Sequence, residues 1–269
     1  MNRITTLFNN KNKNILSVFF TAGATKIDDT LEILEVAQNK GIDLVEIGIP
    51  FSDPMADGPT IQKSSTAALK NGMSLKTLFS QLEYLRKGNI LENGEYSGRN
   101  LILPVILMGY LNPIIQYGIE NFCRKAHECG IDGVIIPDLP FKEYMTTYKT
   151  LSKKYDLKFI MLITPETSQE RIRLIDSNTE GFIYMVSTAS TTGAKAEFNQ
   201  QTNEYFERVN AMNLKNPRLI GFGISNKKTL DNAWSNSSGA IIGSKFVTCL
   251  NDNSNAQTAV DALLKDLQR

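Results

Sequence analysis

The stretch DLVEIGIPFSDPMADGPTIQ (43–62) decides how the rest of the sequence is interpreted. It opens with a short apolar run that is typical of a strand in a buried parallel sheet, and it continues into a loop rich in Asp, Pro and Gly. Side chains alternate along a strand, so the β-branched residues of this run share one face while Glu46 and Gly48 share the other. Because the β-branched face is suited to packing under helices, Glu46 is expected to point to the inner side of the sheet.

Seven further apolar runs rich in Val, Ile and Phe extend this pattern along the chain, with longer amphipathic segments between them. Eight strands, each followed by a helix, predict an α/β fold, a closed (β/α)8 TIM barrel that occupies residues 1–269 as a single domain. Its active site is expected at the C-terminal ends of the strands. A doubly wound open sheet is the alternative fold. The runs are 16–23, 43–50, 101–110, 132–138, 158–165, 181–187, 218–225 and 239–244.

Helical patterns fill the segments between the runs, and several are followed by Gly just before the next strand, as helix C-terminal caps prefer. The segment before the first run, about residues 2–9, predicts a short N-terminal helix that closes the bottom of the barrel. The stretch 88–100, rich in Gly and Asn, is expected to be a surface loop. The other helical candidates are 29–39, 75–87, 119–129, 143–155, 169–177 and 227–234.

The composition argues against several classes of protein. With 29 basic and 28 acidic residues the net charge is +1, which gives no electrostatic reason to expect nucleic acid or an anionic membrane as a partner. The polar start of the chain lacks the apolar core of a secretion signal, and the next apolar run is too short to span a membrane, so we expect a cytoplasmic protein. The single histidine, His127, disfavours a metal site built from imidazoles, and no metal is expected.

The inward carboxylate of Glu46 is the first candidate for chemistry. Burial disfavours the charged form and raises the pKa, which suits a group that gives and takes a proton near neutrality. Gly48 is expected to leave space beside it. The alternative is a structural Glu paired with a barrel Arg or Lys, but the other seven runs offer no obvious basic partner. The loop that follows, predicted over residues 51–62, adds Asp53 and Asp57, which are ordinary turn residues or, at the mouth of the barrel, partners in acid–base work.

Three strand ends that contain Gly converge on one side of the predicted barrel. They are Thr192-Gly193 after the sixth run, Gly223 after the seventh, and Gly243-Ser244 after the eighth. Loops after strands 7 and 8 often hold a phosphate in barrel enzymes, bound by backbone N–H groups at a helix N-terminus. Each Gly alone is also consistent with an ordinary turn.

An apolar pocket is expected near the same strand ends, because several large side chains lie there. Aromatic residues at such spacing are also common in plain protein cores. The candidates are Phe19, Leu107, Tyr110, Ile135 and Tyr184.

The string LVEIGIPFSDPMADGPTIQ closely resembles the signature of tryptophan synthase α subunits. The similarity continues through PVILMGYLNPI, GVIIPDLP, IGFGIS and GAIIGS. The resemblance implies a lyase of tryptophan biosynthesis that splits indole-3-glycerol phosphate into indole and glyceraldehyde 3-phosphate. It also implies Glu46 as the proton-transfer residue and Asp57 as its partner. The substrate- and phosphate-binding residues that it implies are Phe19, Tyr110, Tyr184, Thr192, Gly193, Phe222, Gly223, Gly243 and Ser244.

Residues 187–193 read STASTTG, whereas many members of that family have Gly and Val in place of Ser190 and Thr191. Thr192, the position expected to hydrogen-bond Asp57 when the loop closes, is retained.

The chemistry implied by this resemblance requires neither a metal nor a Schiff base. Lys158 lies at the wrong end of its strand, and Lys195 and Lys245 lie beyond the strands in a loop or helix. Protonation of indole C3 instead makes the ring itself the electron sink. We expect Glu46 to move protons at C3 and at the glyceryl hydroxyl, and Asp57 to stabilise charge at indole N1–H.

The resemblance further implies a partner, the tryptophan synthase β subunit, in an α2β2 heterotetramer. Pyridoxal phosphate is expected in that partner, and no cofactor is expected in this chain. Two alternatives stay open: another phosphate-binding barrel lyase or isomerase, and a non-catalytic module that activates a β subunit. The presence of both Glu46 and Asp57 argues against the second.

Overall fold

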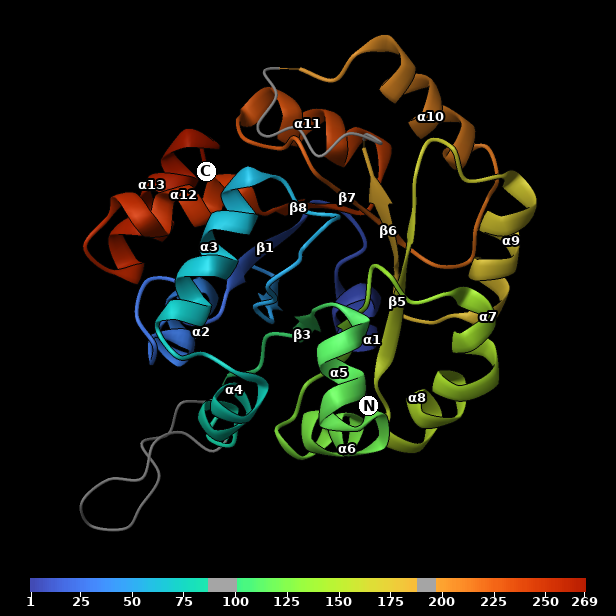
Figure 1. Ribbon diagram of the computed structural model, residues 1–269. Helices are drawn as coiled ribbons and strands as arrows, with labels where there is room; N and C mark the ends of the chain where they lie inside the picture. The colour runs from blue at the N-terminus through green and yellow to red at the C-terminus, as the bar shows by residue number, and fades with distance from the viewer. Residues whose placement is uncertain (87–100, 188–196) are drawn as a thin grey trace.

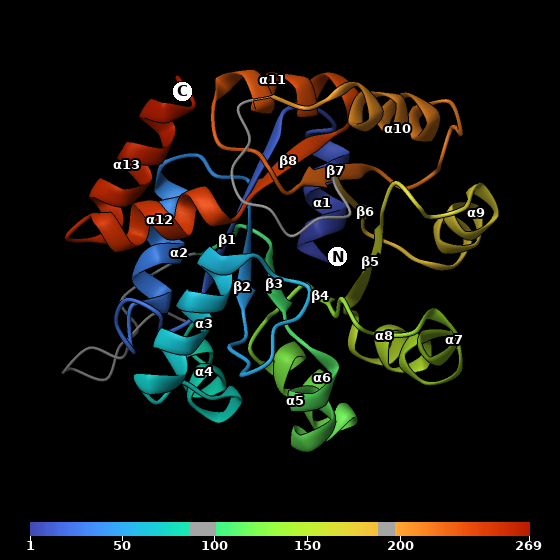
Figure 2. The ribbon, with the colours of Figure 1, turned by 45° about the horizontal axis from the view of Figure 1, so that its top comes forward.

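The computed structural model describes residues 1–86, 101–187 and 197–269. Its eight strands are all parallel and form a closed barrel in chain order, with the last strand hydrogen-bonded to the first. Helices surround the strands, as Figure 2 shows. The predicted (β/α)8 barrel is therefore confirmed, and the open sheet is excluded. The strands are β1 (Ile15–Thr21), β2 (Leu44–Gly48), β3 (Val105–Met108), β4 (Gly133–Ile135), β5 (Lys158–Ile163), β6 (Ile183–Val186), β7 (Arg218–Gly221) and β8 (Gly239–Ile242).

The helices from α2 to α13 follow one another around this barrel in chain order, whereas α1 lies within the ring that they form (Figures 1 and 2). The order is α1 (Arg3–Asn10), α2 (Thr30–Asn39), α3 (Pro59–Lys70), α4 (Leu75–Leu82), α5 (Leu111–Tyr117), α6 (Ile119–Glu128), α7 (Phe141–Glu143), the π-helical turn η1 (Tyr144–Tyr148), α8 (Lys149–Tyr155), α9 (Gln169–Asn178), α10 (Gln200–Asn210), α11 (Lys227–Asn236), α12 (Ser244–Asp252) and α13 (Ala256–Asp266).

Two predictions about helices need correction. The loop after β2 ends at Gly58, because Pro59 occupies the first position of α3, where its fixed φ and missing N–H are well tolerated. The candidate helix 143–155 begins earlier, at Phe141, and contains the π-helical turn η1 before α8. The predicted surface loop 88–100 lies outside the described residues. Along the described part of the chain, no helix is long and apolar enough to cross a membrane.

Alternation along the strands separates two apolar cores. Val45 and Ile47 belong to an outer cluster between the barrel and its helices, whereas Leu44 belongs to a cluster inside the barrel. This is the division that the pattern of β2 predicts. The predicted N-terminal helix is present as α1, and its Ile4, 0% exposed, packs into the inner cluster.

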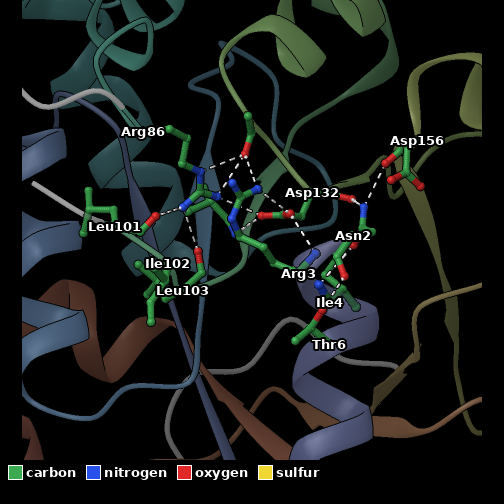
Figure 3. Close-up of polar contacts among 12 residues, drawn as sticks. Asn2, Arg3, Ile4, Thr6, Arg86, Leu101, Ile102, Leu103, Asp132 and Asp156 are labelled. Carbon is green, nitrogen blue, oxygen red and sulfur yellow. Dashed lines mark hydrogen bonds and ion pairs between the residues drawn. The ribbon is translucent and has the colours of Figure 1, made fainter.

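A polar network fixes α1 to the barrel wall around Asp132, which directly precedes β4 (Figure 3). Arg3 and Arg86 form ion pairs with its two carboxylate oxygens at 3.1 and 2.9 Å. The backbone N–H of Val105 donates to the same carboxylate at 3.0 Å, and the side-chain amide of Asn2 donates to the Asp132 carbonyl at 2.9 Å. The start of the chain is thus held to the start of β4 and, through Arg86, to the segment after α4.

Candidate active site

Glu46 lies in the inner wall of the barrel and is 0% exposed. It is in register with Phe19 of β1 on one side and Ile106 of β3 on the other. The Ser17 hydroxyl donates a long hydrogen bond of 3.5 Å to Oε1, and within the described residues Oε2 has no hydrogen-bond partner. Desolvation raises the pKa of the Glu46 carboxyl to about 8, and the Ser17 hydrogen bond opposes this rise. The described residues therefore show Glu46 without the Arg or Lys partner that a purely structural role would require.

Asp57 lies in the loop that leaves β2 and is held there by an aromatic side chain. The Tyr110 hydroxyl donates to Asp57 Oδ2 at 2.8 Å and accepts from the backbone N–H of Ala56 at 2.9 Å. The rings of Phe51 and Tyr110 pack with their centroids 5.2 Å apart. Burial raises the pKa of Asp57, while the hydrogen bond from Tyr110 lowers it by less. Asp53 of the same loop is exposed, and its carboxylate contacts the neighbouring Ser52.

An open cavity of about 630 Å³ lies between this loop and the C-terminal ends of the strands. Two glycines make room for the rings that line it: a Cβ on Gly48 would lie 2.5 Å from the Phe19 ring, and one on Gly221 would overlap the Tyr184 ring. The space beside Glu46 that Gly48 was expected to leave is therefore occupied by Phe19.

The charges of both Glu46 and Asp57 affect the pKa of the Tyr184 hydroxyl. Its pKa is raised well above the ordinary value, first by burial and then by the negative charges of Glu46 and Asp57. Tyr184 and Asp57 both line the cavity, whereas Glu46 does not line it but is close enough for its charge to affect Tyr184.

The segments that follow β7 and β8 also line the cavity. Phe222 and Gly223 have φ values of 70° and 75°, a left-handed conformation that is uncommon for Phe. The Ser187 hydroxyl donates to the Phe222 carbonyl at 2.8 Å and supports this turn. Gly243 is the N-cap of α12 and has no side chain to satisfy the first N–H groups of the helix, starting at Ser244. Such N–H groups, together with the helix dipole, favour an anion.

Most of the predicted site residues that the structure describes come together at the cavity, but Glu46 and Ile135, both fully buried, are not among the residues that line it. Phe19, Tyr184, Phe222, Gly223, Gly243 and Ser244 line the cavity with Asp57, and Tyr110 lines a smaller adjoining cavity that shares Phe19 and Asp57. The pocket prediction for Leu107 was wrong, because this residue lies in the outer cluster under the helices, whereas Ile135 lies in the inner one. Thr192 and Gly193 lie outside the described residues, and their roles stay predictions.

The sequence reasoning missed three features of the site. The contact of Ser17 with Glu46 was foreseeable, because Ser17 lies two residues before Phe19 and shares its inward face. The bond between Tyr110 and Asp57 joins residues 53 apart, and no local pattern indicates it. Lys245 is predicted to lie beyond the strands, and it is indeed in α12, but it also lines the cavity.

A closed eight-stranded parallel barrel with a buried Glu in its inner wall, and with Asp57 and a helix N-terminus at one cavity, is typical of the class of (β/α)8-barrel enzymes. Comparison with known proteins specifies the family. The sequence model described as tryptophan synthase alpha chain matches residues 6–269, and the chain belongs to this family. Members of the family carry the indole-3-glycerol phosphate lyase activity, a carbon–carbon bond cleavage, and family membership implies a β-subunit partner.

Individual relatives agree over the whole length. The tryptophan synthase alpha chain of Parabacteroides distasonis is 58% identical over 269 residues, and that of Phocaeicola vulgatus is 55% identical, each alignment covering 100% of both chains. Among solved structures, the alpha subunit from Legionella pneumophila has a TM-score of 0.84 at 31% identity, covering 100% of this chain and 97% of that one. The A-subunit from Pyrococcus furiosus has a TM-score of 0.82 at 29% identity, covering 96% and 99%.

Proposed function

We propose that Glu46 and Asp57 catalyse the cleavage of indole-3-glycerol phosphate to indole and glyceraldehyde 3-phosphate in the cavity that Tyr184 lines. The observation that carries this proposal is the state of Glu46: a buried carboxyl in the inner wall, with one long hydrogen bond and no basic partner among the described residues. With a pKa of about 8 it is largely protonated at neutral pH, so it is an acid that can donate.

The first step is proton transfer from Glu46 to indole C3. The carboxyl is covered in the free protein, so it has to turn toward the cavity as the indole ring enters. Protonation makes C3 tetrahedral and leaves positive charge on N1. Asp57, oriented by Tyr110, accepts the N1–H hydrogen bond and stabilises that charge.

The second step breaks the bond between indole C3 and the glyceryl chain. The carboxylate left on Glu46 takes the proton of the glyceryl hydroxyl, the aldehyde forms, and the bonding electron pair returns to the ring. One proton is gained at C3 and one is lost from the hydroxyl, so Glu46 ends the reaction as it began. Neither a metal nor a lysine Schiff base enters this balance.

The remainder of the cavity would position the substrate. Phe19, Met108 and Tyr184 offer apolar surface to the indole ring. Gly223 and the start of α12 at Gly243 and Ser244 offer backbone N–H groups to the phosphate, and the predicted Thr192 and Gly193 would complete that end. Phosphate binding at one end and ring binding at the other would hold the scissile bond beside Glu46.

We propose that the chain has the same domain organisation, compartment and assembly that the family implies. Closure of β8 on β1 supports one domain over residues 1–269. We propose a cytoplasmic α2β2 complex in which pyridoxal phosphate is held by the β subunit. Indole is apolar and would escape, so direct delivery to that partner supports the assembly.

The test is release of indole from indole-3-glycerol phosphate by the purified chain, with and without a β subunit. We expect Asp57→Asn to lower kcat/KM by about 10²-fold or more, because it removes the charge at N1–H. Asp53→Asn is the matched control, since it makes the same change in the exposed part of the same loop. Equal activity in the two variants would contradict the role of Asp57, and no turnover by the wild-type chain in either mixture would overturn the proposed function.

A further inference from the structure

Lys245, the second residue of α12, lines the cavity beside Gly243 and Ser244. Among the described residues that line this cavity, it is the only Lys or Arg. Glycine backbone and a serine hydroxyl carry no net charge, and a helix N-terminus supplies only partial charge. A phosphate dianion at this end would therefore meet one full positive charge, that of Lys245.

In the free protein Lys245 pairs with an acidic residue outside the cavity. Its Nζ lies 2.5 Å from Oδ2 of Asp266, the last residue of α13. The helices α12 and α13 lie side by side in both ribbon views (Figures 1 and 2). The lysine side chain is 28% exposed and the aspartate side chain is 46% exposed. Ion pairs with this exposure contribute little, because water screens them.

The same pairing determines what Lys245 can do. The hydrogen bond to Asp266 raises the pKa of the ammonium group, so the group stays charged at neutral pH. A protonated lysine is not a nucleophile and cannot form a Schiff base with a carbonyl. Its chemistry at the cavity is that of a fixed positive charge.

We propose that Lys245 is a substrate-binding residue that pairs with the phosphate of the substrate, and that Asp266 holds it at the cavity edge when the site is empty. A dianion already bound by the N–H groups of α12 is a stronger partner for an ammonium group than one exposed carboxylate. This inference rests on the phosphate-binding role that the proposed function gives to the start of α12. It adds Lys245, which pairs with the phosphate, and Asp266, which competes with the phosphate for Lys245.

The experiment measures binding of inorganic phosphate to the full chain, alone and with a β subunit, from the rise in Tm with phosphate concentration. We expect Lys245→Met, which keeps a long apolar stem, to weaken the phosphate Kd by about tenfold. Asp266→Asn is expected to tighten it by about two- to threefold, because it removes the competitor. The matched control is Lys265→Met, which removes the same charge from an exposed position on α13 and should leave the Kd unchanged.

A wild-type Kd in Lys245→Met, or an equal loss in Lys265→Met, overturns the assignment. The Tm without phosphate shows whether each variant folds. If Lys245→Met does not fold, Asp266→Asn decides, and a Kd that fails to tighten overturns the proposal. Failure of the proposed function is distinguishable, because the wild-type chain would then release no indole, whereas failure of this inference leaves wild-type indole release and phosphate binding intact.

Discussion

Asp132 and Glu46 are both buried carboxylates of this barrel, with 2% and 0% of their surface exposed, but their surroundings differ. Asp132 accepts from Arg3, from Arg86 and from the backbone N–H of Val105. Glu46 accepts one long hydrogen bond, from Ser17. A carboxylate with two cationic partners is fixed in position, whereas a carboxyl in an apolar wall binds its proton tightly and can release it only to a suitable acceptor. The comparison separates a residue that maintains the fold from one that is available for chemistry.

The largest expected effect is on the activity of Glu46→Gln. The amide keeps the shape of the side chain but cannot donate and recover a proton. We expect kcat/KM for indole release to fall by up to about 10⁴-fold, while the free energy of unfolding at neutral pH is not lowered. Steady-state kinetics and urea unfolding of the same preparation measure both. Substantial residual activity in this variant would refute the assignment of the proton transfer.

Urea unfolding of the wild type and of Glu46→Gln at a series of pH values provides the control, because it tests whether Glu46 is a buried acid. The pKa of Glu46 is about 8 in the folded chain and near 4.5 in the unfolded chain, so between these values only the folded state holds the proton. The stability of the wild-type chain should therefore fall as the pH rises from about 4.5 to about 8, relative to Glu46→Gln. The slope is about 1.4 kcal/mol per pH unit at most. Parallel curves for the two proteins would show that Glu46 is not a buried acid.

The next largest effect is expected on the free energy of unfolding of the Asp132→Asn variant. Removing this charge leaves the Arg86 guanidinium, whose pKa burial already lowers to about 10, without its ionic partner. We expect a loss of about 3 kcal/mol in the free energy of unfolding. The fraction that stays folded should release indole at the wild-type kcat. A large loss of kcat in the folded protein would mean that the two ends of the barrel are not independent.

The smallest effect is expected for Ser17→Ala. The Ser17 hydroxyl stabilises the carboxylate form of Glu46, so its removal should raise the pKa of Glu46 further. The limb of the kcat/KM profile where activity declines with increasing pH should move to higher pH, with a change of less than about threefold at pH 7. An unmoved limb would show that Ser17 does not act through the Glu46 carboxyl.

The sequence predicts those features of the fold that are determined by a pattern among neighbouring residues. The barrel follows from the eight apolar runs with helical segments between them, and the inward face of Glu46 follows from alternation within β2. The helix α1 follows from its position before the first strand. The start of α3 was misjudged because Pro59 is equally at home in a loop and at the first position of a helix. Leu107 was misassigned because nearness to a strand end was considered without the alternation, which turns Met108 inward instead.

The rest of the site depends on contacts between distant segments. The Tyr110 hydroxyl reaches Asp57 across two strands and their loops, and Lys245 reaches the cavity because α12 starts at its edge. Side chains of these types occur at many positions of a barrel without such contacts. Residue type and spacing therefore identify the candidates, and the tertiary packing decides which of them meet.

The hydrogen bonding of β8 to β1, from Ile15 with Gly239 to Val18 with Ile242, has a consequence for how the chain is made. A ribosome produces β1 first and its closing neighbour last, and at about 5–20 residues per second the interval is on the order of 10–40 s. During that time one edge of β1 has no strand to pair with. Pairing of residues so far apart in sequence is intrinsically slow, so closure of the barrel should be a late event in folding and the stage most exposed to aggregation.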